Sequence, residues 1–246
     1  MGLSLPRARL VVVPLPGAGE TARLSREEAT HARARRLRSG DPVVLVDGSG
    51  REARAVLRRL DRGGAEVSVD SILEAPSVGP PLALSVSGLR VERLAWLAEK
   101  ATELSADRLT IVSSERTQSF RASRGIQDRL ERVAREAAKQ CEAARWPQIA
   151  GPVPFDRALA EDPSSHRVFL DARGESFPSR LAGRGVVLLV GPEGGWTDAE
   201  RDAARARGWR LAALPAGKLR AETAAVAAMV LARAALLRGI AEAAER

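Results

Sequence analysis

Residues 186–228 read VVLLVGPEGGWTDAERDAARARGWRLAALPAGKLRAETAAVAA and predict two consecutive strand–loop–helix units. Val186–Val190 is an unbroken apolar run, which is typical of a parallel strand buried on both faces. Thr197 and Glu200 form a capping-box pattern that starts a helix, and Gly208 ends it. A second strand is expected over residues 209–214.

A long Ala-rich helix is expected from Glu222 to near Gly239. Loops at the carboxyl ends of adjacent parallel strands form ligand clefts in open α/β sheets. The glycines of GPEGG (191–195) and of the loop 215–220 would let the backbone approach a ligand closely. The alternative is that these glycines only make tight turns, but charge gathers in the second loop at Lys218, Arg220 and Glu222.

The pairing of LVGPEGGWTDAE (189–200) with LPAGKLRAETAA (214–225) resembles the RsmE family of RNA methyltransferases, which belong to the SPOUT superfamily. Three further segments are similar to that family: AEKATEL (98–104), SERT (114–117) and REAAKQ (135–140). The chain departs from the family pattern at Ser105, Lys139 and Ala221, where glycine, glutamate and threonine are usual. Ala221 puts in doubt any role for a hydroxyl group beside the expected active site.

The fold that the resemblance implies is α/β, with a C-terminal trefoil-knotted SPOUT methyltransferase domain built on a parallel sheet and preceded by a small N-terminal PUA-like β-barrel. Spacing alone predicts only a doubly wound sheet, because strands and helices alternate after residue 82 and chain knots are very rare. The resemblance also implies a homodimer with its active site at the subunit interface. The stiff linker APSVGPP (75–81) divides an RNA-binding barrel, residues 1–75, from the methyltransferase domain, residues 76–246.

The activity that the resemblance implies is methyl transfer from S-adenosylmethionine to N3 of a uridine in 16S ribosomal RNA of the small subunit. Carried over residue by residue, donor binding falls on residues of the two loops and of the strand near 170. These residues are Leu170, Gly191, Pro192, Leu214, Gly217, Leu219 and Arg220.

Removal of the uracil N3 proton leaves negative charge on the base, so a nearby cation and a proton acceptor are required. Arg220 is the candidate cation, and Glu193 and Glu222 are weaker candidates for the base or for orienting groups.

RNA is also an expected partner on charge grounds, because 39 basic and 31 acidic residues give a formal net charge of +8. A general excess of arginine, from coding bias or a hot environment, would produce the same balance. The candidate RNA-binding residues are a cluster in the N-terminal segment and one residue of SERT: His31, Arg33, Arg35, Arg36, Arg38 and Arg116. For the N-terminal cluster, a solvated charged face is an equal alternative on charge alone. The segment HARARRLRSGDPVVLVDGSG (31–50) is similar to the PUA-like barrel that opens RsmE proteins, and this resemblance favours RNA binding.

Other classes of protein are less favoured by the sequence. With one cysteine and two histidines, no metal site is expected. No apolar run is expected to reach the length of a membrane span, and the first residues lack the pattern of a signal peptide, so a cytoplasmic protein is expected. Three alternatives remain open: a non-catalytic RNA-binding protein, a knotted methyltransferase that acts on another RNA atom such as a ribose 2′-hydroxyl, and a nucleotide-binding enzyme. The last lacks a G-x-x-x-x-G-K-S/T loop.

Overall fold

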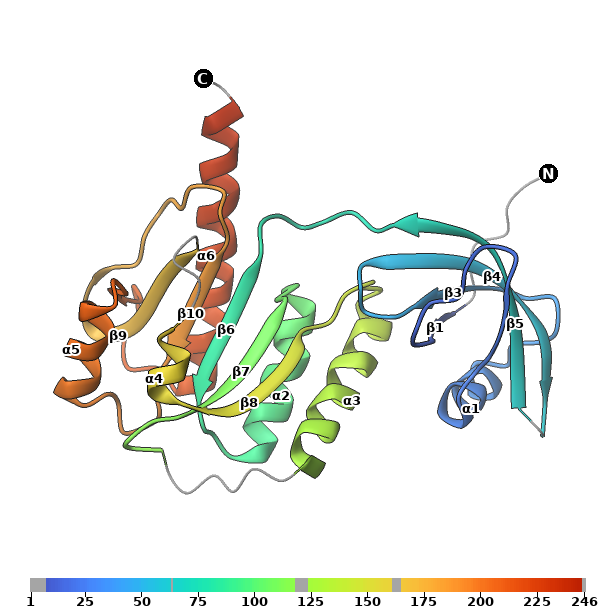
Figure 1. The fold of residues 1–246 in the computed structure, drawn as a ribbon, viewed down its shortest axis with the longest axis horizontal. Helices are drawn as coiled ribbons and strands as arrows, with labels where there is room; N and C mark the ends of the chain where they lie inside the picture. Colours follow the sequence, from blue (N-terminus) through green and yellow to red (C-terminus); the bar gives the residue numbers. More distant parts are fainter. Residues whose placement is uncertain (1–7, 63, 118–123, 161–164, 245–246) are drawn as a thin grey trace. The chain divides into compact units, whose positions relative to one another are not determined.

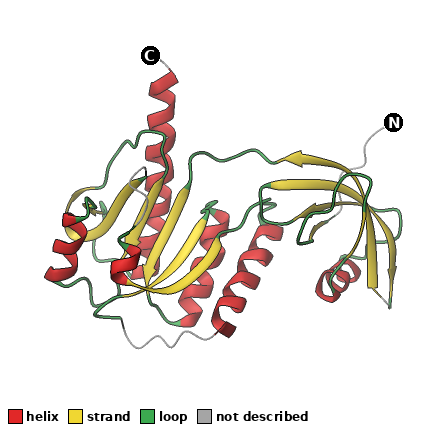
Figure 2. Cartoon of the chain, viewed as in Figure 1, coloured by secondary structure: helices red, strands yellow, loops and turns green. Residues whose placement is uncertain are grey.

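The computed structural model describes residues 8–62, 64–117, 124–160 and 165–244 (Figures 1 and 2). Its contacts divide the chain into two compact units. The first consists of Met1–Ser77 with Ala138–Arg145, and the second of Val78–Ala137 with Trp146–Arg246. Each unit has a hydrophobic core of its own.

The N-terminal unit is a five-stranded sheet of order β1-β3-β4-β5-β2, with one helix packed on it. Its elements are β1 (Arg9–Val11), β2 (Thr21–Arg23), α1 (Arg26–Ala34), β3 (Pro42–Val46), β4 (Arg51–Asp61) and β5 (Gly64–Glu74). Alternate residues of the long β4 and β5 strands point into the core, as the period of two requires for a sheet with one buried face. Sequence patterning missed β2, which is only three residues long.

A buried ion pair lies inside this unit and explains one departure from the family pattern. Lys139 Nζ donates to Glu28 Oε1 at 2.9 Å, and both side chains are almost fully buried. The other oxygen, Glu28 Oε2, accepts from the backbone N–H of Val11 at 3.1 Å. Ser25 and Glu28 have the spacing that predicts a capping box, but the Glu28 carboxylate bonds within the core instead, so only the bond from Glu28 N–H to Ser25 Oγ is present.

The C-terminal unit is a six-stranded parallel sheet of order β11-β9-β10-β6-β7-β8, with helices on both faces (Figure 2). Its strands are β6 (Leu82–Ser87), β7 (Arg108–Ser113), β8 (Gln148–Pro154), β9 (His166–Ser176), β10 (Val186–Val190) and β11 (Arg210–Ala213). Its helices are α2 (Val91–Glu103), α3 (Arg124–Gln140, of which the residues from Ala138 onward belong to the first unit), α4 (Phe155–Ala158), α5 (Asp198–Ala206) and α6 (Ala221–Ala244). The predicted alternation of strands and helices is confirmed, while β8 and the short α4 were not predicted.

The central strand β10 is buried on both faces, as its unbroken apolar run predicted. Val186, Leu188 and Val190 pack in the core that α2 and α6 cover, and Val187 and Leu189 pack in a second core on the opposite face. The capping box of Thr197 and Glu200 at the start of α5 is confirmed.

The last helix, α6, is longer than expected and continues through Gly239 to Ala244. A Cβ added at Gly239 would lie 1.9 Å from the carbonyl oxygen of Leu181, in the segment between β9 and β10. Gly239 is therefore a point of close packing between two backbones and not a helix terminator.

The expectation that no segment reaches membrane-span length also needs correction, because Ala221–Ala243 has the length and a mean hydropathy of 1.7. Core helices meet the same criterion, and Ala225, Ala228, Met229 and Leu236 of α6 are fully buried.

The helical pattern around Cys141 predicts a small buried side chain, and this prediction is wrong. The helix α3 ends at Gln140, one residue before Cys141, and the thiol-bearing residue is exposed. The chain turns there, with Glu142 at a φ of +56°, so the apolar face of the helix does not continue to residue 141.

Candidate donor-binding and active site

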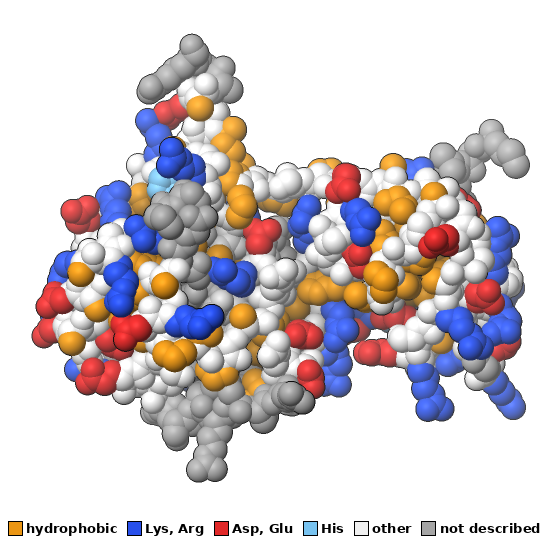
Figure 3. Space-filling model, viewed as in Figure 1, with side chains coloured by type: hydrophobic (Ala, Val, Ile, Leu, Met, Phe, Trp, Pro, Cys, Tyr) orange, Lys and Arg blue, Asp and Glu red, His pale blue; other side chains and the backbone are white. Residues whose placement is uncertain are grey.

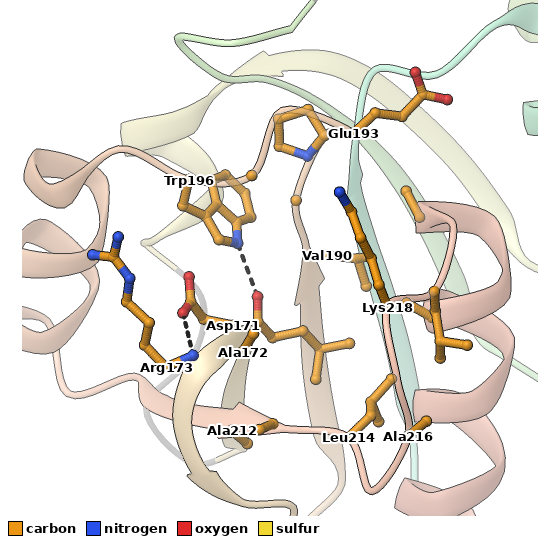
Figure 4. A pocket seen from close by; sticks show the side chains of 18 of the residues that line it. Asp171, Ala172, Arg173, Val190, Glu193, Trp196, Ala212, Leu214, Ala216 and Lys218 are labelled. Carbon is orange, nitrogen blue, oxygen red and sulfur yellow. Dashed lines mark hydrogen bonds between the residues drawn. The ribbon is translucent and has the colours of Figure 1, made fainter.

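A cavity of about 390 Å³ lies at the carboxyl ends of β9 and β10, where the two glycine-bearing loops meet (Figure 4). Three segments supply most of its lining: the end of β9, the loop Gly191–Trp196, and the loop between β11 and α6. The cavity lies where open α/β sheets bind ligands, beyond the carboxyl ends of their strands.

The cavity lies beside an interruption in the pairing of β9 with β11. Leu211 pairs with Phe169, but the next residue, Ala212, pairs with Glu175, so residues 170–174 leave the ladder. Leu170, Asp171, Ala172 and Arg173 from this interruption all line the cavity. The apolar pattern of residues 168–171 predicts a strand that ends at Asp171 and shows no sign of the interruption, because register shifts depend on the partner strand.

Gly191 brings the first loop against the indole ring of Trp196. A Cβ at residue 191 would lie 2.8 Å from the ring, which is closer than side-chain atoms approach one another. The indole Nε1 in turn donates to the carbonyl oxygen of Leu170 at 2.9 Å. The GPEGG loop is therefore fixed to the end of β9, and its backbone forms one wall of the cavity (Figure 4).

The structure brings together nearly all of the predicted donor-binding residues. Every one of them except Arg220 lines the cavity: Leu170, Gly191, Pro192, Leu214, Gly217 and Leu219. Arg220 lies in the same loop and is exposed, and its guanidinium makes no hydrogen bond or ion pair with the described part of the chain.

Glu193 and Glu222, the other two candidate catalytic residues, share one arginine partner. The guanidinium of Arg93, on α2, pairs with Glu193 through Nη1, and its Nε lies 3.5 Å from Glu222 Oε1. Glu193 lines the cavity and its side chain is half exposed, whereas Glu222 is buried and its Oε2 has no partner among the described residues. Arg93 was not among the predicted site residues, although its position in the first turn of α2 puts it near the carboxyl end of β6.

Arg116 also belongs to this region. Its Nη1 donates to the carbonyl oxygen of Gly194 at 3.0 Å, so the segment SERT supports the GPEGG loop. The adjacent N–H of Glu115 donates to Oε1 of Glu200, whose other oxygen closes the capping box of α5. Lys100 and Glu103 belong to the segment AEKATEL, which is similar to the family. They form an ion pair at 2.7 Å on the surface of α2, so their role here is structural.

Two arginine–aspartate pairs neutralise most of the charge along the β9 wall. Arg201 Nε lies 2.7 Å from Asp171 Oδ2, and both side chains are buried. Burial alone would lower the pKa of Arg201, but Asp171 and Asp198 outweigh it and raise the pKa. Arg173 pairs with Asp198 at 2.7 Å at the surface, and this charge is the main cause of a lowered pKa for Asp198.

The N-terminal basic cluster lies on and just after α1, where Lys and Arg side chains project in Figure 3. Arg33 donates to the carbonyl oxygen of Asp61 at 2.7 Å. Arg35, Arg36 and Arg38 are exposed, and His31 is partly buried.

Ala221 is buried and lines the cavity, so no hydroxyl group enters the cavity from this position. No group of three or more potential metal ligands occurs among the described residues.

Comparison with known proteins gives two family matches. A family model for an RNA methyltransferase domain matches residues 78–233, and one for an RNA methyltransferase PUA domain matches residues 24–70. The chain is 32% identical over 229 residues to ribosomal RNA small subunit methyltransferase E of Mycobacterium bovis, covering 87% of each protein. It is 30% identical over 231 residues to the protein of that name from Synechocystis, covering 90% of this chain and 75% of the relative.

Solved structures show the same fold. A probable rRNA methyltransferase from Porphyromonas gingivalis superposes with a TM-score of 0.82 at 27% identity, covering 97% of this chain and all of the other. The ribosomal RNA small subunit methyltransferase E of Neisseria gonorrhoeae, bound to S-adenosyl methionine, superposes with a TM-score of 0.81 at 24% identity. That match covers 91% of this chain and 95% of the other.

Proposed function

This chain belongs to the RNA methyltransferase family, and from that premise we propose that it transfers a methyl group from S-adenosylmethionine to N3 of a uridine in small-subunit ribosomal RNA. The observation that carries the proposal is the cavity between the two family motifs, since it is lined by the residues to which the resemblance assigns donor binding.

The cavity fits a nucleoside-containing donor. Its volume of about 390 Å³ lies in the range of small-molecule sites, which is roughly 300–1,000 Å³. Backbone from Gly191 and Gly217 and apolar side chains of Leu170, Leu214 and Leu219 would hold the adenosine. Larger residues are excluded at position 191 by the Trp196 ring, which keeps the backbone of this wall accessible.

The donor, when bound, supplies a methyl group activated by a sulfonium. The chain's own residues have to remove the N3 proton and stabilise the charge that then spreads to the flanking uracil carbonyl oxygens. Arg220 is exposed beside the cavity and supplies the cation. Glu193 lines the cavity and accepts the proton, and the buried Glu222 orients the start of α6.

RNA binding falls to residues 1–75, with phosphates held by Arg33, Arg35, Arg36, Arg38 and His31. The match to an RNA methyltransferase PUA domain over residues 24–70 supports this assignment. Binding through phosphate contacts weakens steeply as salt increases. Because ribosomal RNA is the proposed substrate, we place the protein in the cytoplasm.

The proposal includes a trefoil knot and a homodimer. Support for the knot comes from the segment between β9 and β10, which lies against α6: Leu181 N–H donates to the carbonyl oxygen of Ala235 at 3.1 Å. Support for the homodimer comes from apolar side chains exposed along α6, which rises at the top of Figure 3. Val230, Leu237 and Ile240 are each at least 41% exposed.

The test is methyl transfer from labelled S-adenosylmethionine to small ribosomal subunits that lack the native modification, with the product nucleoside identified. We expect label at N3 of a uridine, and a rate lower by at least about 100-fold for Arg220→Ala, since it removes an electrostatic stabiliser of the transition state. Arg205→Ala is the matched control, because Arg205 is an exposed arginine on α5 that pairs only with Asp202 among the described residues.

Label on a ribose or on another base would contradict the assigned target atom and leave the methyltransferase assignment intact. Donor binding without transfer would contradict the choice of RNA. Absence of donor binding would contradict the proposal and favour a non-catalytic RNA-binding protein.

A further inference from the structure

Five charged side chains line the cavity: Asp171, Arg173, Glu193, Arg201 and Lys218. Four of them have partners. Arg201 pairs with Asp171 at 2.7 Å, Arg173 pairs with Asp198 at 2.7 Å, and Glu193 pairs with Arg93. Within the described part of the chain, no hydrogen bond or ion pair joins Lys218 to another residue.

Lys218 is the charged lining residue that remains available to a ligand. Its side chain extends from the loop before α6 along the cavity toward the GPEGG loop (Figure 4). The N-terminus of α6 follows at Ala221, which also lines the cavity. The unpaired N–H groups of a helix N-terminus add positive potential, but Glu222 already lies in the first turn of α6, so the ammonium of Lys218 is the feature that favours negative charge on this side of the cavity.

We propose that Lys218 binds the carboxylate of the amino-acid portion of the methyl donor. This inference rests on the proposed function. The carboxylate is the donor's single anionic group, and an ammonium-to-carboxylate hydrogen bond is the charge-assisted interaction that Lys218 can offer. The adenosine then occupies the part of the cavity nearest Leu170 and Leu214, and Lys218 selects for a ligand that retains the carboxylate.

The experiment compares two ligands that differ only in that group: S-adenosylhomocysteine and its decarboxylated analogue. Affinities are measured by isothermal titration calorimetry for the full-length wild-type protein, Lys218→Met, Lys218→Arg and Lys100→Met. Lys100 is the matched control, because it lies on α2 in pairs with Glu99 and Glu103 and does not line the cavity. Since Lys218 is exposed, thermal melting is expected to show all four proteins folded alike.

We expect Lys218→Met to weaken S-adenosylhomocysteine about 10-fold, in line with the loss of one charge-assisted hydrogen bond. Lys218→Met should bind the decarboxylated analogue as tightly as wild type does, or slightly more tightly, since the ammonium group of the analogue no longer faces the lysine cation. Lys218→Arg should retain most of the affinity, and Lys100→Met should behave as wild type. Raising the salt concentration should shrink the difference between wild type and Lys218→Met, because salt screens the interaction.

Equal losses for both ligands would overturn the inference, because Lys218 would then act on the loop and not on the carboxylate. Unchanged binding of both ligands, with weaker binding of small-subunit RNA, would overturn it in favour of a phosphate contact. If the wild-type protein bound neither ligand, the proposed function itself would fail, so the two failures are distinguishable.

Discussion

The indole Nε1 of Trp196 donates a 2.9 Å hydrogen bond to the carbonyl oxygen of Leu170, and this bond joins two walls of the cavity. Leu170 begins the segment that leaves the β9–β11 ladder, and Trp196 ends the GPEGG loop. The same ring occupies the space that a side chain at Gly191 would need. One buried tryptophan therefore satisfies a carbonyl at the interruption of the sheet and sets the position of the loop.

Trp196→Phe should weaken donor binding. The substitution removes the hydrogen bond and leaves the Leu170 carbonyl without it, at a cost of about 1–3 kcal/mol in the free energy of unfolding. Trp209→Phe is the matched control, because Trp209 is also buried and donates to the Leu159 carbonyl at 3.1 Å, away from the cavity. Urea unfolding should show similar losses for both variants, whereas calorimetry should show a donor affinity about 10-fold lower only for Trp196→Phe. Equal donor affinities would contradict this role.

Arg93→Met should slow methyl transfer while leaving donor affinity unchanged. Arg93 holds Glu193 and Glu222 but does not line the cavity, so its loss misplaces both carboxylates without removing a donor contact. Misplacement of reacting groups costs roughly 10- to 100-fold in rate. Single-turnover kinetics would measure the effect, with Arg93→Lys expected to restore part of the rate. Arg129→Met, a substitution at the surface of α3, is the control. A loss of donor affinity equal to the loss of rate would show that Arg93 acts on binding instead.

Gly239→Ala should destabilise the protein, although alanine favours helices by about 1 kcal/mol over glycine. The added Cβ would lie 1.9 Å from the Leu181 carbonyl oxygen, so the segment between β9 and β10 would have to move away from α6. We expect a loss of about 1–3 kcal/mol in unfolding free energy, the usual range for overpacking. Gly183→Ala is the control, because its Cβ would meet Ile240 at an ordinary 3.6 Å. A stabilised Gly239→Ala protein would mean that propensity outweighs this contact.

Asp47 should make the N-terminal unit sensitive to acid. Burial raises the pKa of Asp47, but hydrogen bonds from Ser49 and from the Leu15 N–H outweigh it and hold the pKa below the ordinary carboxyl value. A carboxylate with a depressed folded pKa stabilises the fold above the unfolded pKa of about 3.9, and this stability is lost as pH falls through the folded pKa. Urea unfolding of wild type and Asp47→Asn should therefore differ at pH 7 and converge toward pH 2. A difference that stays constant with pH would contradict this assignment.

The sequence by itself determined the local elements around the cavity. An apolar run of five residues is long enough to make Val186–Val190 a buried strand, and Thr197 with Glu200 caps the next helix through bonds within one turn. These features depend on neighbours along the chain, so their patterns are visible without the fold. The two family motifs also identified most of the cavity lining, because both loops follow strands that lie on either side of β9 in one sheet.

Only the tertiary structure decided the contacts between distant segments. The interruption of β9 at residues 170–174 depends on its register with β11, and the partner of Lys139 is Glu28, more than a hundred residues away. β6 and β10 are neighbouring parallel strands, so the helix α2 after β6 and the GPEGG loop after β10 begin at the same edge of the sheet. Arg93 of α2 therefore reaches Glu193 in that loop. Gly239 predicted a helix end by propensity, but α6 continues through it, and the missing Cβ leaves the space that the Leu181 carbonyl occupies. Local pattern sets which residues form strands, helices and caps, whereas packing sets which of their side chains meet.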